Sequence, residues 1–309
     1  MKDNISLSVI IPVHNEEEVI EKTIKQTITT LKEIGINPCI TIIDDGSSDN
    51  SWGEIKKITS EYKTSVKAIK LSRNFGKDSA IIAGLESKES DLYLVIDADG
   101  EHPIEKIKDF YSCYRKSNCD VVHGIKENRR GGKTSRTYSK LFNIIFNSLT
   151  NIDLKQSSDY KLFNKKFRNA LLSYGDYDYF YRAAAQDVGF QAETVYFDEK
   201  ERVVGKTSWG NIKLAKYALN SIINYSHYPL YLILLMGLIS IILGLGLGLK
   251  VLIDIFGHNV APDGYLSLLI LSLLSMGMIM SSIGILGIYV SKIFNEVKAR
   301  PRYIISESI

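Results

Sequence analysis

The sequence predicts an α/β domain with a mainly parallel sheet, followed by an interface helix and two transmembrane helices. Two observations lead to this prediction. Between residues 8 and 116, short runs of branched apolar residues alternate with helical segments, the pattern of parallel strands joined by crossover helices. Toward the C-terminus, residues 229–249 and 265–291 contain no charged residue. Each run can cross a hydrocarbon layer of ~30 Å as a helix.

The alternation gives four strands and four helices in order. Strands are expected where branched apolar residues run together, at 8–13, 39–43, 66–71 and 92–96. Helices are expected after each of them, at about 14–34, 52–61, 78–86 and 104–116. The first helix is expected to open with His14 because acidic residues follow it, and the helix dipole favours acids in a first turn.

Each predicted strand is followed by polar residues, and the fourth carries the most informative set. Asp97 and Asp99 follow a buried apolar run, and Gly100 and Pro103 supply a turn. Ligands of open α/β sheets bind at the carboxyl ends of the strands, and two carboxylates there can hold a hard cation. On this motif alone, a pair of solvated turn carboxylates is an equally good interpretation.

The charges around the two apolar runs predict the membrane topology. Basic residues precede the first span and follow the second, whereas the connecting loop has only Lys250 near the membrane. The positive-inside rule therefore predicts that both termini and the large domain are cytoplasmic. Spans are expected at about 229–251 and 265–291, within a membrane domain of residues 228–309 that ends in a short cytoplasmic tail.

Residues 209–227 are expected to form an amphipathic helix. Apolar side chains recur there at helical spacing, with lysines elsewhere. Such a helix can lie at the membrane interface and contact lipid, although packing of its apolar stripe on the preceding domain is an open alternative.

Composition argues against a nucleic-acid-binding protein and against a fold held by disulfides or by cysteine-bound metal. The net charge is only +3, and no basic run is interleaved with aromatic residues, so a nucleic-acid partner is not expected. Cys39, Cys113 and Cys119 show neither metal-ligand spacing nor a paired framework, which suits a reducing compartment.

Four motifs together identify a family resemblance. In order they are Pro12-Val13-His14-Asn15-Glu16-Glu17, Ile43-Asp44-Asp45-Gly46-Ser47-Ser48-Asp49, Ser72-Arg73-Asn74-Phe75-Gly76-Lys77 and Asp97-Ala98-Asp99. Their order and spacing resemble the inverting GT-A glycosyltransferases, which have a Rossmann-like fold. With two C-terminal spans, the chain is similar to the polyprenyl-phosphate glycosyltransferases, such as those that make dolichyl-phosphate mannose or glucosylate bactoprenol. The GT-A domain would cover residues 1–208.

The resemblance implies a nucleotide-sugar site built from these motifs. Its expected donor-binding residues are Pro12, His14, Glu16, Ile43, Asp45, Asp97, Ala98, Lys126, Arg202 and Ser208. Lys126 stands where the family usually has arginine, and Ser208 where it usually has lysine. The resemblance also implies Mg²⁺ or Mn²⁺ as cofactor, with Asp97, Asp99 and Glu101 as candidate ligands.

The resemblance assigns the acceptor end as well. Ser158-Asp159-Tyr160-Lys161-Leu162 is similar to a family segment that meets the acceptor, so Asp159 and Asp99 are the candidate catalytic residues. A lipid phosphate has its second ionisation near ~6 and is largely dianionic at neutral pH. Asp159 is therefore expected to orient the acceptor and to deprotonate any monoanion. The negative charge of the acceptor phosphate could be offset by Arg129, Arg130 and Arg136, which are expected in a loop with two glycines. A solvated basic loop without this role is the alternative.

The expected function is transfer of one sugar, with inversion, to undecaprenyl phosphate at the cytoplasmic membrane face for cell-envelope glycosylation. UDP-glucose is the first expectation for the donor; UDP-N-acetylglucosamine, UDP-galactose and GDP-mannose are alternatives. A non-catalytic membrane scaffold that retains the fold is a further alternative, motivated by Lys126 and Ser208. The resemblance also favours a homo-oligomer, either a dimer or a tetramer.

Overall fold

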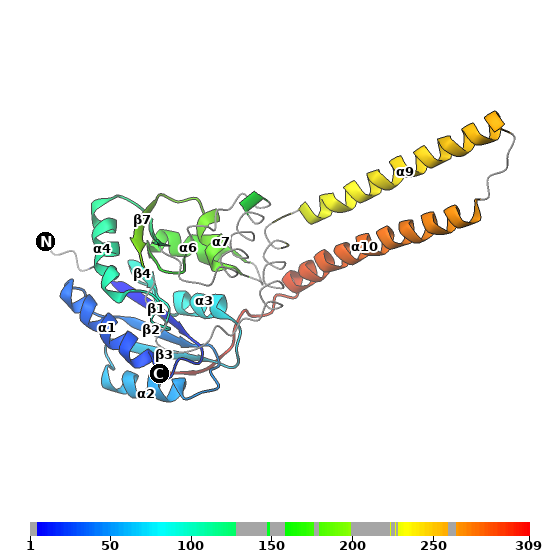
Figure 1. The fold of residues 1–309 in the computed structure, drawn as a ribbon. Coiled ribbons are helices and arrows are strands. Elements are labelled where there is room, and N and C mark those ends of the chain that lie inside the picture. The colour runs from blue at the N-terminus through cyan, green and yellow to red at the C-terminus, as the bar shows by residue number, and fades with distance from the viewer. Residues whose placement is uncertain are drawn as a thin grey trace. The chain divides into compact units, whose positions relative to one another are not determined.

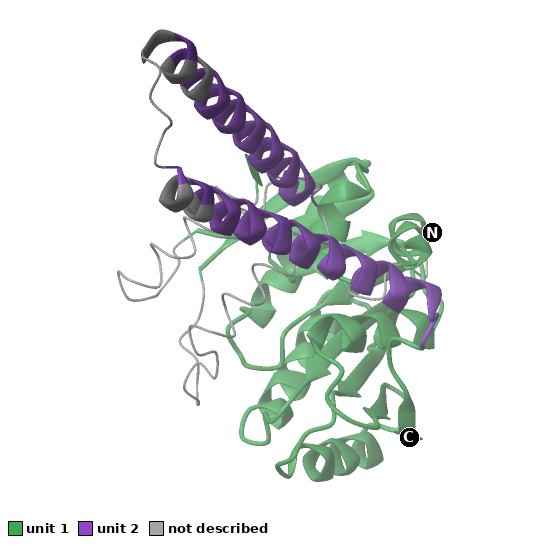
Figure 2. Cartoon of the chain, turned by 90° about the vertical axis from the view of Figure 1, so that its right-hand side faces the viewer, with its two compact units in different colours: residues 1–214, 301–309 green, residues 215–300 purple. Residues whose placement is uncertain are grey.

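The structure is a computed structural model, and it describes residues 5–127, 147–148, 158–175, 179–198, 223, 226, 228–258 and 264–309. The chain divides into two compact units (Figure 2). The first comprises Met1–Leu214 together with Pro301–Ile309, and the second Ala215–Arg300. Residues 301–309 were predicted as part of the membrane domain, whereas here they belong to the first unit.

Four parallel strands form the centre of the sheet in the first unit, as the sequence predicts. They are β1 (Leu7–Val13), β2 (Ile40–Asp44), β3 (Val66–Leu71) and β4 (Leu92–Val95). They lie side by side in the order β4-β1-β2-β3, and every pairing among them is parallel. All four carboxyl ends therefore lie at the same edge of the sheet.

Residues alternate along these strands between two apolar layers, one on each face of the sheet. Val9 and Ile11 belong to one core cluster, while Ile10 belongs to the other. The first cluster contains residues of α1 (Ile20–Glu33), α2 (Ser51–Glu61) and α4 (Ile107–Lys116), which follows a 3₁₀ turn, η1 (Ile104–Lys106). The second contains residues of α3 (Lys77–Ser87), α6 (Lys165–Ser173) and α7 (Tyr181–Asp187). Helices thus cover both faces of the sheet (Figure 1).

Three further strands extend the sheet beyond β4 and were not predicted. They are β5 (Val121–Lys126), β6 (Lys161–Asn164) and β7 (Ala192–Phe197). β6 is antiparallel to both β4 and β5, and β7 is parallel to β5. Because β6 pairs with β4, it brings the segment that begins at Ser158 beside the carboxyl end of β4.

The eighth strand comes from the end of the chain. β8 (Ile305–Ser308) is antiparallel to β3, and completes the order β7-β5-β6-β4-β1-β2-β3-β8. The Ser72 N–H donates to the Ile304 carbonyl at 2.8 Å, and Ala68 and Ile309 exchange two backbone hydrogen bonds. The strand covers an edge of the sheet that would otherwise present unpaired backbone groups.

The first helix begins later than predicted. We expected it to open at His14, but α1 starts at Ile20. Asn15 has a left-handed backbone (φ 57°), and its side-chain oxygen accepts from the Ser48 N–H at 2.8 Å. Residues 14–19 therefore form a turn that is bound to the loop after β2.

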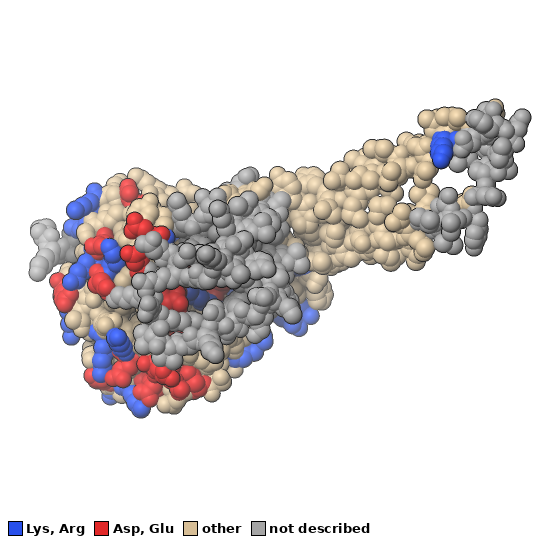
Figure 3. All heavy atoms as spheres, viewed as in Figure 1, with Lys and Arg blue, Asp and Glu red and all other residues tan. Residues whose placement is uncertain are grey.

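The second unit contains the two apolar helices, α9 (Tyr228–His258) and α10 (Tyr265–Val297). Tyr228–Lys250 and Leu271–Val297 are long and apolar enough to cross a membrane, with mean hydropathies of 2.7 and 1.9. Charged side chains are almost absent from the face of these helices seen in Figure 3 and are frequent on the first unit. These helices agree with the two predicted spans in position and composition.

Candidate active site

The candidate site lies at the carboxyl ends of β1 to β4. Val13 is in register with Asp44, and Asp44 with Lys70, so the loops that follow these strands are neighbours. Pro12 is in register with Ile43 in the same two strands, and both residues are buried.

His14 connects three of the predicted motifs. Its Nδ1 lies 2.9 Å from the carbonyl oxygen of Asp45, and its Nε2 lies 3.0 Å from the side-chain nitrogen of Asn74. A carbonyl can only accept, so Nδ1 carries the proton and Nε2 accepts from the amide. The imidazole therefore joins the loops after β1, β2 and β3. Glu16 is anchored nearby, through its backbone N–H, to the Ser51 hydroxyl at 2.8 Å.

Asp45 binds the loop that leads into α3. Its Oδ1 accepts from the Phe75 N–H at 2.7 Å, and its Oδ2 accepts from the Gly76 N–H at 2.9 Å. Burial raises the pKa of this carboxyl, although the two N–H groups oppose the shift. Gly46 makes the close approach of the two loops feasible, because a Cβ there would meet the backbone carbon of Arg73 at 2.4 Å.

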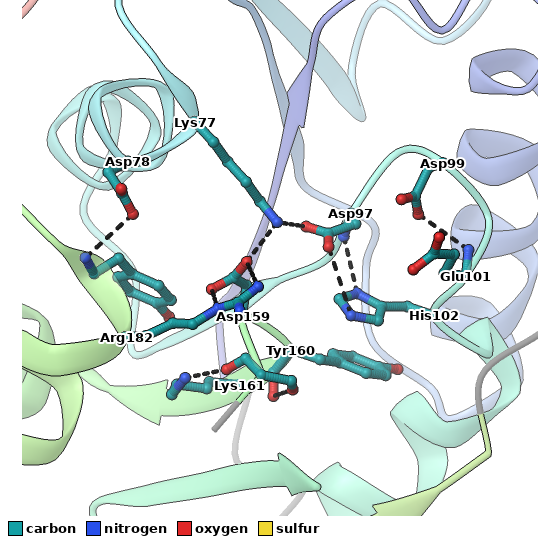
Figure 4. Close-up of polar contacts among 12 residues, drawn as sticks. Lys77, Asp78, Asp97, Asp99, Glu101, His102, Asp159, Tyr160, Lys161 and Arg182 are labelled. Carbon is teal, nitrogen blue, oxygen red and sulfur yellow. Dashed lines mark hydrogen bonds and ion pairs between the residues drawn. The ribbon is translucent and has the colours of Figure 1, made fainter. Parts of the chain in front are cut away.

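The turn after β4 directs its acidic side chains in two directions (Figure 4). Asp97 points toward Lys77 and His102. Asp99 accepts through Oδ1 from the Glu101 N–H at 3.0 Å, and Glu101 lies 3.9 Å from Lys126. Ala98, between the two aspartates, is buried, and its carbonyl accepts from the Thr23 hydroxyl at 3.2 Å.

His102 supports Asp97 from within the core. Its Nδ1 accepts from the Asp97 N–H at 3.1 Å, which places the proton of the neutral ring on Nε2, 3.6 Å from Oδ2 of Asp97. The ring is buried and stacks on Tyr160, with centroids 4.8 Å apart. Burial lowers the pKa of His102, against the opposing charge of Asp97, and thereby favours the neutral ring.

Lys77 joins the two halves of the site. Its Nζ lies 2.5 Å from Oδ1 of Asp97 and 2.5 Å from Oδ2 of Asp159. Arg182, in the first turn of α7, approaches Asp159 from the other side and donates from Nε to Oδ1 and from Nη2 to Oδ2, both at 2.7 Å. One ammonium group therefore links the carboxylate after β4 to the one that precedes β6 (Figure 4).

These contacts set the charge state of the network. Burial would raise the pKa of Asp159, but Arg182 and Lys77 outweigh it and hold the pKa well below its usual range. Burial would likewise lower the pKa of Lys77, but Asp159 and Asp97 raise it instead. Asp97 also has a lowered pKa, since Lys77 and His102 overcome its burial. All three side chains are ionised at neutral pH.

A second lysine lies beneath this network. Lys161 is fully buried in β6; its Nζ donates to the carbonyl of Ser158 and lies 5.1 Å from the ring centroid of Tyr181. Burial lowers the pKa of Lys161 to about 7, with Asp159 opposing the shift and Arg182 adding to it. His123, on the adjacent strand β5, has its pKa lowered to about 3 by burial and by the charge of Lys161.

The acidic turn offers the oxygen ligands that a hard divalent cation prefers. Within the part of the chain that the structure describes, however, no three acidic, histidine or cysteine side chains converge as a ready cage. Asp99 and Glu101 lie together, while the oxygens of Asp97 face Lys77 and His102. The donor set fits Mg²⁺ or Mn²⁺ if a ligand phosphate supplies the remaining oxygens.

Several predicted site residues lie outside the described residues. They are Arg129, Arg130, Arg136, Arg202 and Ser208. The same holds for nearly all of the predicted interface helix, residues 209–227.

No role was predicted from the sequence for Lys77, His102, Lys161 or Arg182. Lys77 and Lys161 stand inside predicted motifs, and His102 lies three residues after Asp99 in the predicted turn. Their position in those segments was the available signal. Arg182 carried no such signal, because only the fold brings it to Asp159.

Comparison with known proteins assigns the family. The sequence profile described as Glycosyl transferase family 2 matches residues 8–182. The glycosyltransferase YkoT of Bacillus subtilis (strain 168) is 32% identical, over 97% of this chain and 90% of that protein. The undecaprenyl-phosphate 4-deoxy-4-formamido-L-arabinose transferase of Proteus mirabilis (strain HI4320) is 30% identical, over 98% of this chain and 94% of that protein.

Among solved structures, glucosyl-3-phosphoglycerate synthase from Mycobacterium tuberculosis, in complex with Mn²⁺, UDP-glucose and phosphoglyceric acid, is similar with a TM-score of 0.48. It is 16% identical, and the similarity covers 71% of this chain and 78% of that one. The profile match spans more than half of the chain. The chain therefore belongs to glycosyl transferase family 2, and its first unit is a GT-A, Rossmann-like domain that two apolar helices follow.

Proposed function

We propose that this glycosyltransferase moves one sugar from a nucleotide sugar to undecaprenyl phosphate, with inversion, at the cytoplasmic face of the membrane. The observation that carries the proposal is the position of Lys77, 2.5 Å from both Asp97 and Asp159. In the proposed roles, Asp97 belongs to the donor end of the site and Asp159 to the acceptor end. A single ammonium group between them puts the two ends next to each other, as transfer between two bound substrates requires.

The donor is assigned to the loops after β1, β2 and β4. His14 and Asp45 would border the nucleoside together with Glu16 and with Pro12 and Ile43, each of which is the last residue but one of its strand. The phosphates would lie toward Ala98 and Lys126. Arg202 and Ser208, which are not among the described residues, are further candidates for contacts with the donor. UDP-glucose is our first choice of donor; UDP-N-acetylglucosamine, UDP-galactose and GDP-mannose are the alternatives.

A divalent cation would be held by Asp99 and Glu101, with Asp97 joining them if Lys77 moves. When bound, Mg²⁺ or Mn²⁺ supplies positive charge that stabilises the leaving nucleoside diphosphate. The chain's own part is to hold these carboxylates in one turn. His102 contributes by binding both the backbone N–H and the carboxylate side of Asp97.

Undecaprenyl phosphate is supported as acceptor by two observations. The Proteus mirabilis relative is named for transfer on that lipid and matches this chain along nearly its whole length. The chain also has two helices that can reach a membrane-bound substrate. The predicted interface helix at 209–227 and a cytoplasmic catalytic unit belong to this proposal. Arg129, Arg130 and Arg136 remain our candidates for a loop that offsets the acceptor charge.

The acceptor phosphate attacks the anomeric carbon in line with the departing diphosphate, which inverts the configuration. At neutral pH the phosphate is already largely a dianion, since its second ionisation is near ~6. The protein therefore has mainly to position two anions and to screen their repulsion. Asp159 orients the acceptor in this scheme.

The test is a reconstituted reaction. The full chain in detergent would receive Mg²⁺, undecaprenyl phosphate and each of the four nucleotide sugars separately, with glycolipid product identified by mass spectrometry. We expect one productive donor for the wild-type chain and for Asp109→Asn, a control at an exposed carboxylate paired with Lys106. Asp99→Asn should lose the product. Nucleotide binding without glycolipid from any donor would reject the proposal and favour the scaffold alternative.

A further inference from the structure

In the network around Asp159, the carboxylate is buried and the two cations that bind it are exposed to solvent. The anion is buried, with 4% of its side chain exposed, while the two cations that bind it are 40% exposed at Lys77 and 41% at Arg182. Asp159 therefore faces the protein, and the positive groups face the site. A molecule that enters the site meets the cations before it meets the carboxylate.

This arrangement argues against proton removal by Asp159. Both of its oxygens accept from Arg182 at 2.7 Å, and Oδ2 also lies 2.5 Å from Lys77. A carboxylate so engaged has a pKa well below its usual range. To take a proton it would have to give up contacts with two cations, each a charge-assisted hydrogen bond. Its evident effect is to fix where the ammonium and the guanidinium lie.

An exposed guanidinium beside an exposed ammonium is chemically suited to a phosphate monoester. The planar fork of arginine matches phosphate oxygens in pairs, and lysine adds a compact point charge. Buried Lys161 lies in β6, two residues after Asp159, and because burial lowers its pKa to about 7 it adds only part of a positive charge at neutral pH. In addition, Lys77 touches Asp97, so a phosphate at this pair would lie at the boundary with the donor end.

We propose that Lys77 and Arg182 form the binding site for the phosphate group of the acceptor, and that Asp159 is a positioning residue that holds the two cations. This inference rests on the proposed function, and deepens it by naming the groups that recognise the acceptor. The contact with the acceptor phosphate is thereby assigned to the N-terminal ends of α3 and α7, where Lys77 and Arg182 lie.

The experiment measures acceptor binding in the absence of donor and metal. Farnesyl phosphate, farnesol and inorganic phosphate would be titrated separately into the full chain in detergent, with affinity read by thermophoresis. Variants would be Arg182→Gln, Arg182→Lys, Lys77→Met and Lys77→Arg. The matched control is Lys165→Met, which removes an exposed lysine from an ion pair with Glu89. UDP affinity and the melting temperature would be measured for each protein as readouts of the donor site and of folding.

We expect the wild-type chain and Lys165→Met to bind farnesyl phosphate at least tenfold more tightly than farnesol. Arg182→Gln and Lys77→Met should lose most of that preference, and the conservative Arg182→Lys and Lys77→Arg should regain part of it. UDP affinity should stay within about twofold of the wild type for the Arg182 variants and for Lys165→Met, which change no residue in contact with the donor end. Inorganic phosphate should compete weakly with farnesyl phosphate in the wild-type chain and in Lys165→Met, but not in Arg182→Gln or Lys77→Met.

Two results would overturn the inference in distinguishable ways. If the wild-type chain prefers the phosphate and Arg182→Gln and Lys77→Met prefer it equally, the cation pair is not the site, and the proposed function stands. If the wild-type chain shows no preference for farnesyl phosphate over farnesol, the lipid-phosphate acceptor itself is rejected, and this inference falls with it. Inorganic phosphate binding as tightly as farnesyl phosphate would support the cation pair and reject the lipid as its ligand.

Discussion

The Nε1–H of Trp52 donates a hydrogen bond of 3.0 Å to the carboxylate of Glu307, joining α2 to a strand at the far end of the chain. Lys56 pairs with the same carboxylate at 2.7 Å. In the backbone, β8 satisfies the edge of β3. The last residues of the chain are therefore part of the catalytic unit's structure.

Removal of residues 301–309 should destabilise the catalytic unit. It would expose the edge of β3 and leave the Trp52 indole without this partner, so we expect the melting temperature to fall by several degrees, about 2–4 °C for each kcal/mol lost. Tryptophan fluorescence of the full and shortened chains in detergent would measure it. Glu307→Gln, which retains an acceptor for Trp52, should melt close to the wild type. Equal melting of the shortened chain would contradict a structural role for β8.

Two glycines provide a matched test of loop crowding. Gly46 and Gly35 both have left-handed backbones, with φ of 61° and 75°, but only at Gly46 would a Cβ meet neighbouring backbone. Gly35→Ala should therefore cost about 1 kcal/mol from backbone conformation alone. Gly46→Ala should cost roughly 1–3 kcal/mol more, because the loop at Arg73 must move. It should also weaken UDP binding, measured by calorimetry, whereas Gly35→Ala should leave that affinity unchanged. Equal effects at the two sites would show that crowding is not what Gly46 relieves.

Asp78 should make stability depend on pH. Burial and the charge of Asp159 raise its pKa to about 6, from 3.8 for an ordinary aspartate. Between these values the folded protein binds more protons than the unfolded chain, so this group's contribution to stability falls as pH rises and is lowest above pH 6.

Asparagine at position 78 keeps an oxygen for the Tyr181 N–H, which Asp78 accepts at 3.2 Å, and removes the charge. We expect Asp78→Asn to be more stable than the wild type by about 1 kcal/mol near neutral pH, with the difference vanishing near about pH 4. Thermal unfolding across that range would measure it, with Asp109→Asn as control. A variant that is less stable at every pH would refute this account.

The acid limb of the pH–rate profile should belong to the acceptor. Asp159 has a pKa well below its usual range, so it stays ionised where the enzyme works. The proposed acceptor, a phosphate monoester, becomes a dianion near ~6, and the rate should rise with pH through that value. A phosphonate analogue of the acceptor, whose second ionisation needs a higher pH, should shift the limb upward. A limb that stays in place would instead point to a protein group, such as Asp78 with its pKa of about 6.

The centre of the sheet could be predicted from sequence because its signals are local. Each strand from β1 to β4 is a short apolar run with a polar loop after it, and those loops carry the motifs. His14, Asp45 and Asp97 were singled out in this way, and the structure brings together the strands and loops that carry them. β8 could not be found, since its residues form a strand only by pairing with β3, more than 200 residues earlier.

The surroundings of Asp159 were predicted less completely, for a physical reason. Asp159 was found by its motif, but its environment depends on Lys77, 82 residues before it, and Arg182, 23 residues after it. Sequence spacing does not reveal such contacts. Without them, Asp159 was expected to orient the acceptor and to deprotonate any monoanion, whereas its two ion pairs favour a carboxylate that stays charged.

The order of the strands has a consequence for biosynthesis. A ribosome makes β8 only after it has made both α9 and α10. The other seven strands are therefore synthesised before the two apolar helices, and the eighth strand after them. The sheet is completed last, by a segment that is made only after both apolar helices. Completion of the sheet is thus coupled in time to the synthesis of α9 and α10, and until then the backbone groups at the edge of β3 are unpaired.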